Sequence, residues 1–161
     1  MIRTVGQRKS ERGTTLVEFA LSTVLLLTVL LGIIDVGRVL YSFDWVSDAA
    51  RRGARWAMVR GSSCQIPGSP PTSCSANSSA IQTYVESNAF GIQTNSSYLT
   101  VTSICTVNAA GGSPPSSSPP CAPGYPVQVT VQYTMTYTSP FAPVLVPPWT
   151  MTSTSQMVVS Q

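Results

Sequence analysis

Four cysteines are the residues of this chain best able to form covalent bonds with one another. They are Cys64, Cys74, Cys105 and Cys121. An even number of cysteines is typical of a disulfide framework in an oxidising compartment. Of the three possible pairings, 64–74 and 105–121 are favoured because each closes a short Pro-rich loop, and unpaired buried thiols are the alternative. A zinc site is not expected, since the chain has no His and no C-x2-C spacing.

One carboxylate interrupts the most apolar stretch of the chain. Residues 19–34 carry no charge, and extending the stretch back to Thr14 gives 21 residues interrupted only by Glu18. An ionised carboxylate at the centre of a membrane costs about 2.5–3.5 kcal/mol, and less near one end of the span. Such an acid either reaches the headgroups by itself or has a cationic partner. Both readings stay open at this point.

The rest of the chain has few groups for catalysis. Charged residues make up 9% of the sequence, and Glu86 is the only one among the 101 residues after Arg60. Acid–base and nucleophilic catalysis need titratable partners in a pocket, and no carboxylate pair or Ser-His-Asp set can be assembled in this half. Nucleic-acid binding needs clustered Lys and Arg, which are also missing there. We therefore expect neither an enzyme nor a cofactor nor a nucleic-acid partner.

The element that holds Glu18 is expected to be a membrane-spanning helix, because about 20 apolar residues cross a bilayer core. A cleaved signal peptide is the alternative, but no A-x-A site follows Ile34, so we expect the helix to be retained. Basic residues on both sides of the span leave only a small charge asymmetry, which favours a cytoplasmic N-terminus. The cysteines support the same orientation, because disulfides require the C-terminal domain to be outside, in an oxidising compartment.

The residues around the start of this span resemble a processing site. A basic leader ends at Gly13, four residues separate it from Glu18, and Phe19 follows inside the apolar helix. This arrangement is similar to the processing site of type IV prepilins. Glu-Phe at these positions is more like the pilins and pseudopilins of tight-adherence (Tad, Flp or type IVc) systems. Residues 32–41 and 49–57 are further similar to the TadE family.

The resemblance implies what happens to the chain. A membrane aspartyl peptidase would cut after Gly13 and leave Thr14 as the new N-terminus. The carboxylate of Glu18 would then compensate an ammonium group, thought to belong to the neighbouring subunit, and so set the register of assembly together with Phe19. Implied partners are the prepilin peptidase, other pilins or pseudopilins, the inner-membrane assembly platform and the lipid bilayer. The chain departs from the commonest type IV pilins, which have Phe where Thr14 stands.

Hydrophobic periodicity predicts an α+β, pilin-like fold. Apolar residues recur every three or four positions beyond the span, which indicates one long helix over 14–59 that is amphipathic in its outer half and ends at Gly61. A short helix over 80–89 is expected with Ser79 as its cap. Strands are expected over 98–106, 127–138 and 150–159, and the last two would form an antiparallel pair in a small sheet packed on the helix. The predicted parts are a leader (1–13), the helix (14–60) and an exported Ser/Thr/Pro/Cys-rich β domain (61–161).

Two functions are compatible with this organisation. The resemblance implies a TadE-like minor pilin or pseudopilin, anchored in a bacterial inner membrane and used in pilus assembly, surface attachment or secretion. The alternative is an anchored periplasmic or surface module that never polymerises and binds a ligand on its Thr/Gln sheet face. A cluster of arginines after the span is either a solvated face or a contact for anionic lipids. It comprises Arg51, Arg52, Arg55 and Arg60.

Overall fold

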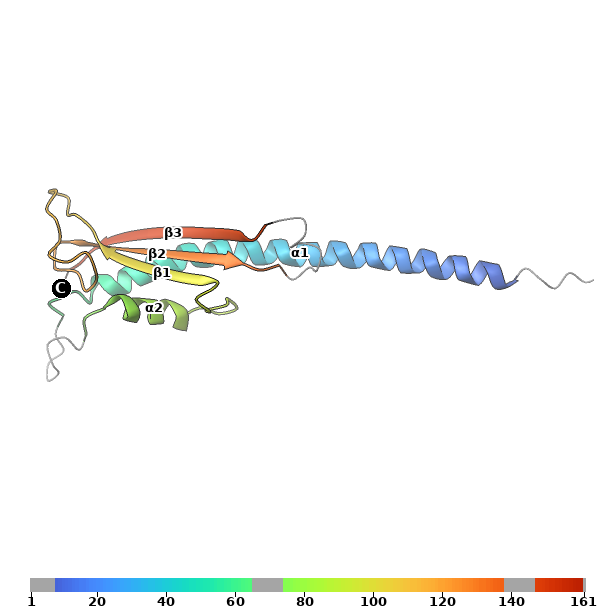
Figure 1. Cartoon of the computed structure of the whole chain (residues 1–161), viewed down its shortest axis with the longest axis horizontal. Coiled ribbons are helices and arrows are strands. Elements are labelled where there is room, and N and C mark those ends of the chain that lie inside the picture. The colour runs from blue at the N-terminus through green and yellow to red at the C-terminus, as the bar shows by residue number, and fades with distance from the viewer. Residues whose placement is uncertain (1–7, 65–73, 138–146, 161) are drawn as a thin grey trace, which may run out of the picture. The chain divides into compact units, whose positions relative to one another are not determined.

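The first element of the chain is a long helix, α1 (Arg8–Met58). The computed structural model describes residues 8–64, 74–137 and 147–160, and Figure 1 shows the order of the elements. The chain divides into two units, and α1 contributes to both. One contains the chain up to Arg38 together with residues 137–147, and the other contains residues 39–136 and 148–161. The predicted α+β class is confirmed.

Helix α1 begins earlier than predicted, because the last residues before Gly13 are also helical. These residues include Arg, Lys and Glu and no Pro, and such residues favour a helix. Within the apolar run, the hydroxyl groups of Thr23 and Thr28 donate to the carbonyl oxygens four residues earlier, at 2.8 Å. The helix therefore satisfies both its backbone and these side chains internally, as a membrane environment requires.

The second helix, α2 (Ser78–Ser87), corrects one prediction. Its cap is Asn77 and not Ser79: the Asn77 side-chain oxygen accepts from the amide of Ala80 at 2.8 Å and from the Ser79 hydroxyl at 2.9 Å. Asn is at least as good an N-cap as Ser, and capping from Asn77 leaves both following serines inside the first turn. The helix buries Ile81 and Val85, which lie one turn apart on the same face.

Three strands form an antiparallel sheet in the order β1-β2-β3. They are β1 (Leu99–Cys105), β2 (Pro126–Met135) and β3 (Trp149–Val158). The predicted pairing of the last two strands is confirmed. Strand β2 ends three residues before the predicted Thr138, because its ladder stops where Met135 pairs with the first residue of β3. Alternation along β2 places one set of side chains in the core, as expected from the period of two. The buried set is Val127, Val129, Val131, Tyr133 and Met135.

Small residues of α1 form the centre of the core in the second unit. Ala50, Ala54 and Ala57 are buried there with the inner face of β2 and with α2. Gly53 lies at the closest approach: a Cβ atom at this position would be 3.2 Å from methyl groups of both Val129 and Val85. The outer half of α1 is thus amphipathic because the protein's own sheet and second helix cover its small-residue face.

Replacing Gly53 by Val is expected to lower the free energy of unfolding by about 1–3 kcal/mol, because the added methyl groups overfill a packed three-way contact. The measurement is urea unfolding of the detergent-solubilised protein, followed by tryptophan fluorescence. Gly37→Val is the matched control, because Gly37 is on the same helix and a Cβ there meets nothing within 4 Å. Equal midpoints for the two variants would contradict the packing argument.

Candidate assembly surface on the N-terminal helix

All four residues of the predicted processing and assembly site lie on α1. Gly13 and Thr14 are in uninterrupted helix, and Glu18 lies four residues after Thr14, on the same side of the helix. The side chains of Glu18 and Phe19 are exposed. Glu18 makes no ion pair with any other residue that the structure describes. The helix therefore presents a carboxylate and an aromatic ring one turn from the predicted new N-terminus, Thr14.

An apolar surface surrounds this part of the helix on all sides. A soluble amphipathic helix buries one stripe and keeps the rest polar, whereas here every large apolar side chain between Leu16 and Ile34 except the partly buried Leu31 is about half exposed or more. Such a patch exceeds what a monomeric soluble protein usually shows. By length and composition this is one helix that could cross a membrane. The exposed set is Leu16, Val17, Phe19, Leu21, Val24, Leu25, Leu26, Leu27, Val29, Leu30, Ile33 and Ile34.

Charged groups resume at the end of the apolar run. Asp35 is 7% exposed, and one of its oxygens lies 3.9 Å from a guanidinium nitrogen of Arg38, one turn later. Farther along, Arg52 forms an ion pair with Asp48. Both pairs have the i,i+3 or i,i+4 spacing of neighbours on one face of a helix. The burial of Asp35 was missed, because residue spacing says nothing about what covers a side chain.

The arginine cluster after the span divides into different roles. The guanidinium carbon of Arg60 lies 4.4 Å from the centroid of the Trp56 ring, and Trp56 stacks on Tyr84 with their centroids 5.0 Å apart. Arg60 therefore joins the end of α1 to an aromatic pair that connects both helices. Arg51 and Arg55 are exposed. The four arginines therefore do not share one role: Arg60 contacts Trp56 and Arg52 pairs with Asp48, whereas Arg51 and Arg55 are exposed.

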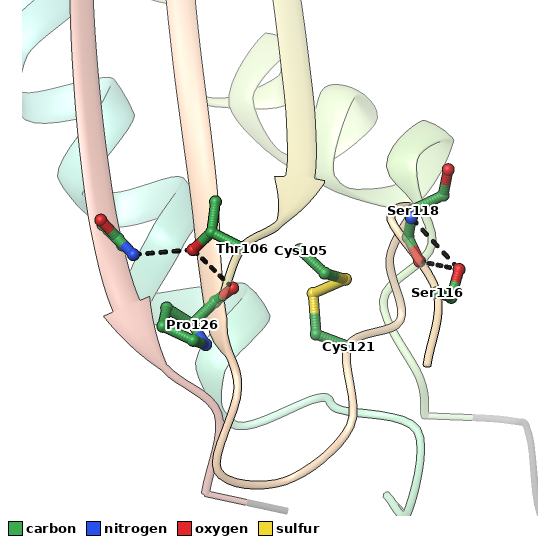
Figure 2. The surroundings of a disulfide bond; sticks show 7 residues. Cys105, Thr106, Ser116, Ser118, Cys121 and Pro126 are labelled. Atoms are coloured by element: carbon green, nitrogen blue, oxygen red, sulfur yellow. Dashed lines mark hydrogen bonds between the residues drawn. A yellow bond between two sulfur atoms is a disulfide. The ribbon is translucent and has the colours of Figure 1, made fainter. Parts of the chain in front are cut away.

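Both disulfides follow the favoured pairing. Cys64 is joined to Cys74, and Cys105 to Cys121. Figure 2 shows the second bridge, which ties the end of β1 to the Ser/Pro-rich loop that follows it. The same loop is held by backbone hydrogen bonds from the Cys105 amide to the Ser117 carbonyl, at 2.9 Å, and from the Ser62 amide to the Cys121 carbonyl, also at 2.9 Å. The bridge thus connects β1, this loop and the chain just beyond α1.

Over the described parts of the chain, no group of three or more His, Cys, Asp or Glu side chains is placed to hold a metal ion. The hollows on the second unit lie beside the aromatic residues of α1 and α2. One is lined by Trp56, Tyr84 and neutral polar residues of α2, and another by Tyr41, Trp45, Phe90 and their neighbours.

The fold and this surface define a class: an α+β protein in whose described residues one helix, near the N-terminus, could cross a membrane and continues into a small, disulfide-bonded domain. Its N-terminal segment is TadE-like, because residues 13–55 match the model of the family described as TadE-like protein. No curated protein and no solved structure matches the chain.

Proposed function

We propose that this protein is a structural subunit of a tight-adherence pilus, a minor pilin or pseudopilin rather than an enzyme. It is made as a precursor that a prepilin peptidase cuts between Gly13 and Thr14. The observation that carries the proposal is the position of Glu18: an exposed carboxylate on an apolar helix, one turn after the cut, within the TadE-like segment. A simple anchor gains nothing from an acid there, whereas a helix that must recognise a new ammonium group does.

In this proposal the helix first holds the subunit in the inner membrane, with the N-terminus in the cytoplasm and the disulfide-bonded domain in the periplasm. The apolar helix surface then passes from lipid to the helices of other pilins as the assembly platform incorporates the subunit. The inventory of side chains supports a structural role, because the chain has no His and a single charged residue after Arg60. The expected result is a protein that contributes to pilus biogenesis, surface attachment or secretion.

A second candidate rests on the outer face of the sheet. The hydroxyls of Thr130 and Thr154 lie 3.0 Å apart, and those of Thr134 and Thr150 lie 3.2 Å apart, so two rows of neutral polar side chains run across β2 and β3. A membrane-anchored module that never polymerises could hold a neutral ligand or a protein on this face. It would need no acid at Glu18.

The deciding measurement is the N-terminal residue and the intact mass of the mature protein, from cells with and without the prepilin peptidase. We expect the chain to begin at Thr14 only when the peptidase is present. A chain that begins at Met1 or Ile2 in both strains would overturn the processing proposal and favour the anchored module. The mass also reports both disulfides, because each one removes two hydrogens.

A further inference from the structure

Large apolar side chains are exposed at one end of the second unit, and they come from three separate elements. Leu40 and Phe43 belong to α1 and are 63% and 64% exposed, Phe90 follows α2 and is 79% exposed, and Trp149 begins β3 and is 58% exposed. These four residues are called the apolar rim below. Phe90 and Trp149 lie far apart in the sequence, and the sequence pattern did not single them out.

Hydrogen bonds and strand register place the rim residues at the same end of the unit. The hydroxyl of Tyr41 donates to the carbonyl oxygen of Phe90 at 2.6 Å, so the chain after α2 lies against the start of this unit's part of α1. At the opposite end, the Ser160 amide, just past β3, donates to the Met58 carbonyl. The helix from residue 39 to residue 58 and the ten residues of β3 are both about 30 Å long. Trp149 therefore begins β3 at the end where this part of α1 begins.

Figure 1 shows the same arrangement within the second unit: the tip of β2, the start of β3 and the chain that follows α2 lie at one end of the sheet. Trp149 pairs with Met135 and shares its face of the sheet, which is the face toward the core. Unlike Met135 it is not covered. The core face of the sheet therefore continues to an exposed apolar side chain, Trp149, at the end of the unit where residue 39 lies.

Chain distance keeps the first residues of the second unit close to the end of the apolar run. If the Glu18 carboxylate lies at one interface, about 20 residues of helix cross the hydrocarbon core of about 30 Å and reach the other interface near Arg38. The next five residues, up to Phe43, rise about 7.5 Å, which is close to the depth of one headgroup layer. Whatever the angle between the two units, residues 39–43 stay this close to Arg38 along the chain.

We propose that the apolar rim inserts into the headgroup layer of the leaflet nearest the domain and seats the domain on the bilayer. This proposal rests on the membrane-anchored role proposed above. Trp149 suits this layer because tryptophan combines an apolar body with a polar N–H group, and Leu40, Phe43 and Phe90 add apolar surface. The rim contains no Lys or Arg, and the charges beside Phe90 are of both signs: Asp44, and Asp48 in an ion pair with Arg52. Burial of apolar surface, and not attraction to anionic lipid, therefore drives the contact.

The test uses full-length protein in phosphatidylcholine vesicles and the fluorescence of single tryptophans. A Trp45→Phe, Trp56→Phe variant leaves Trp149 as the only tryptophan. We expect its emission to shift to the blue on reconstitution, and to be quenched more strongly by lipids labelled near the headgroup than by lipids brominated deep in the acyl chains. Adding salt or anionic lipid should leave both results unchanged. In the matched Trp45→Phe, Trp149→Phe variant, Trp56 lies toward the far end of α1 and should not be quenched.

A second reporter of the rim is needed in case the Trp45→Phe, Trp56→Phe variant does not fold. The Phe90→Trp, Trp149→Phe variant keeps the partly buried Trp45 and Trp56. Their contribution is removed by subtracting the fluorescence of the Trp149→Phe variant, so that only the tryptophan at residue 90 is observed. We expect the added tryptophan to be quenched by the shallow labels as well, because residue 90 is on the same rim.

A tryptophan inside the span separates the two proposals. Leu26→Trp should be quenched by labels deep in the bilayer. If it is not, the membrane-anchor proposal fails and the rim proposal fails with it. Deep quenching at residue 26 without any lipid quenching at Trp149 overturns the rim proposal alone. A blue shift of Trp149 that disappears when the protein is diluted in lipid would mean that a second copy covers the rim, which also overturns it.

Discussion

Replacing Glu18 by Gln is expected to reduce strongly the entry of this subunit into pilus assemblies, while the precursor is still cut after Gly13 and stays in the membrane. The carboxylate is exposed on α1 and makes no ion pair within the described structure. In an apolar environment it is stabilised only by a cation, and cleavage creates one, the ammonium group of Thr14. A hydrogen bond to a charged group contributes about 1.5–3 kcal/mol. Its loss corresponds to a decrease of about ten- to one-hundred-fold in incorporation.

The measurement is the amount of subunit that is recovered with sheared surface filaments or cross-linked to other pilins, relative to the amount in the membrane. Leu25→Gln is the matched control, since it adds the same amide to an exposed position of the same apolar helix without removing an acid. Glu18→Asp keeps the charge on a shorter side chain, and the variant should be incorporated at a level between those of Glu18→Gln and the unchanged protein. Unaltered incorporation of Glu18→Gln would remove the main support for the pilin proposal and favour the anchored binding module.

Removing the bridge between Cys105 and Cys121 is expected to have the largest effect on stability. Replacing both residues by Ala should lower the free energy of unfolding by about 3 kcal/mol, the chain-entropy estimate for a closed loop of this length. The two residues are separated by 16 positions and both are buried. Ala is chosen over Ser because it leaves no hydroxyl group without a partner in the core.

The bridge also holds the ends of the strands together, an effect that the entropy estimate from loop length does not include. Next to it, the Thr106 amide donates to the Pro126 carbonyl at 2.9 Å, and the Gln156 side chain donates to the Thr106 hydroxyl at 2.7 Å, so the ends of all three strands meet beside the disulfide (Figure 2). Without the bridge, we expect the hydrogen-bonded ends of the strands to exchange their amide protons faster than the centre of β2 does.

Urea unfolding of the solubilised protein measures the stability effect. With a slope of about 1–3 kcal/mol per molar urea, the midpoint should fall by about 1–3 M. The matched variant replaces Cys64 and Cys74 by Ala. Its loop is shorter, with a separation of 10, so its loss should be smaller by a few tenths of a kcal/mol. An unchanged midpoint in the Cys105/Cys121 variant would show that the strands hold this end of the sheet without the disulfide.

Much of this architecture was predictable because it depends on local pattern. The apolar run before Asp35 exceeds the length of a bilayer core, and the alternation along β2 follows the period of a half-buried strand without interruption. The disulfide pairing followed from the short loops, since cysteines that are close in sequence meet at little entropic cost. The motif around Gly13 and Glu18 was also readable in the sequence, and its role in processing and assembly stays a prediction.

Other features depended on the backbone conformation at one residue or on contacts between distant segments. The cap of α2 is Asn77 because that residue, among several adjacent candidates, has the required extended backbone. The stacking of Trp56 on Tyr84 joins residues 28 positions apart in the sequence. Neither amphipathic period nor propensity contains that information, because both describe only neighbours along one element.

The sequence by itself determined a long apolar helix, a polar domain with alternating strands and two short disulfide loops, because hydrophobic period and loop length act locally. Only the tertiary structure decided which apolar residues are covered. It buries Gly53 and the alanines of α1 among Val129 and Val85 and leaves Phe90 and Trp149 exposed at one end of the sheet. Burial depends on how several elements pack together, so side chains of similar hydrophobicity become core in one place and open surface in another.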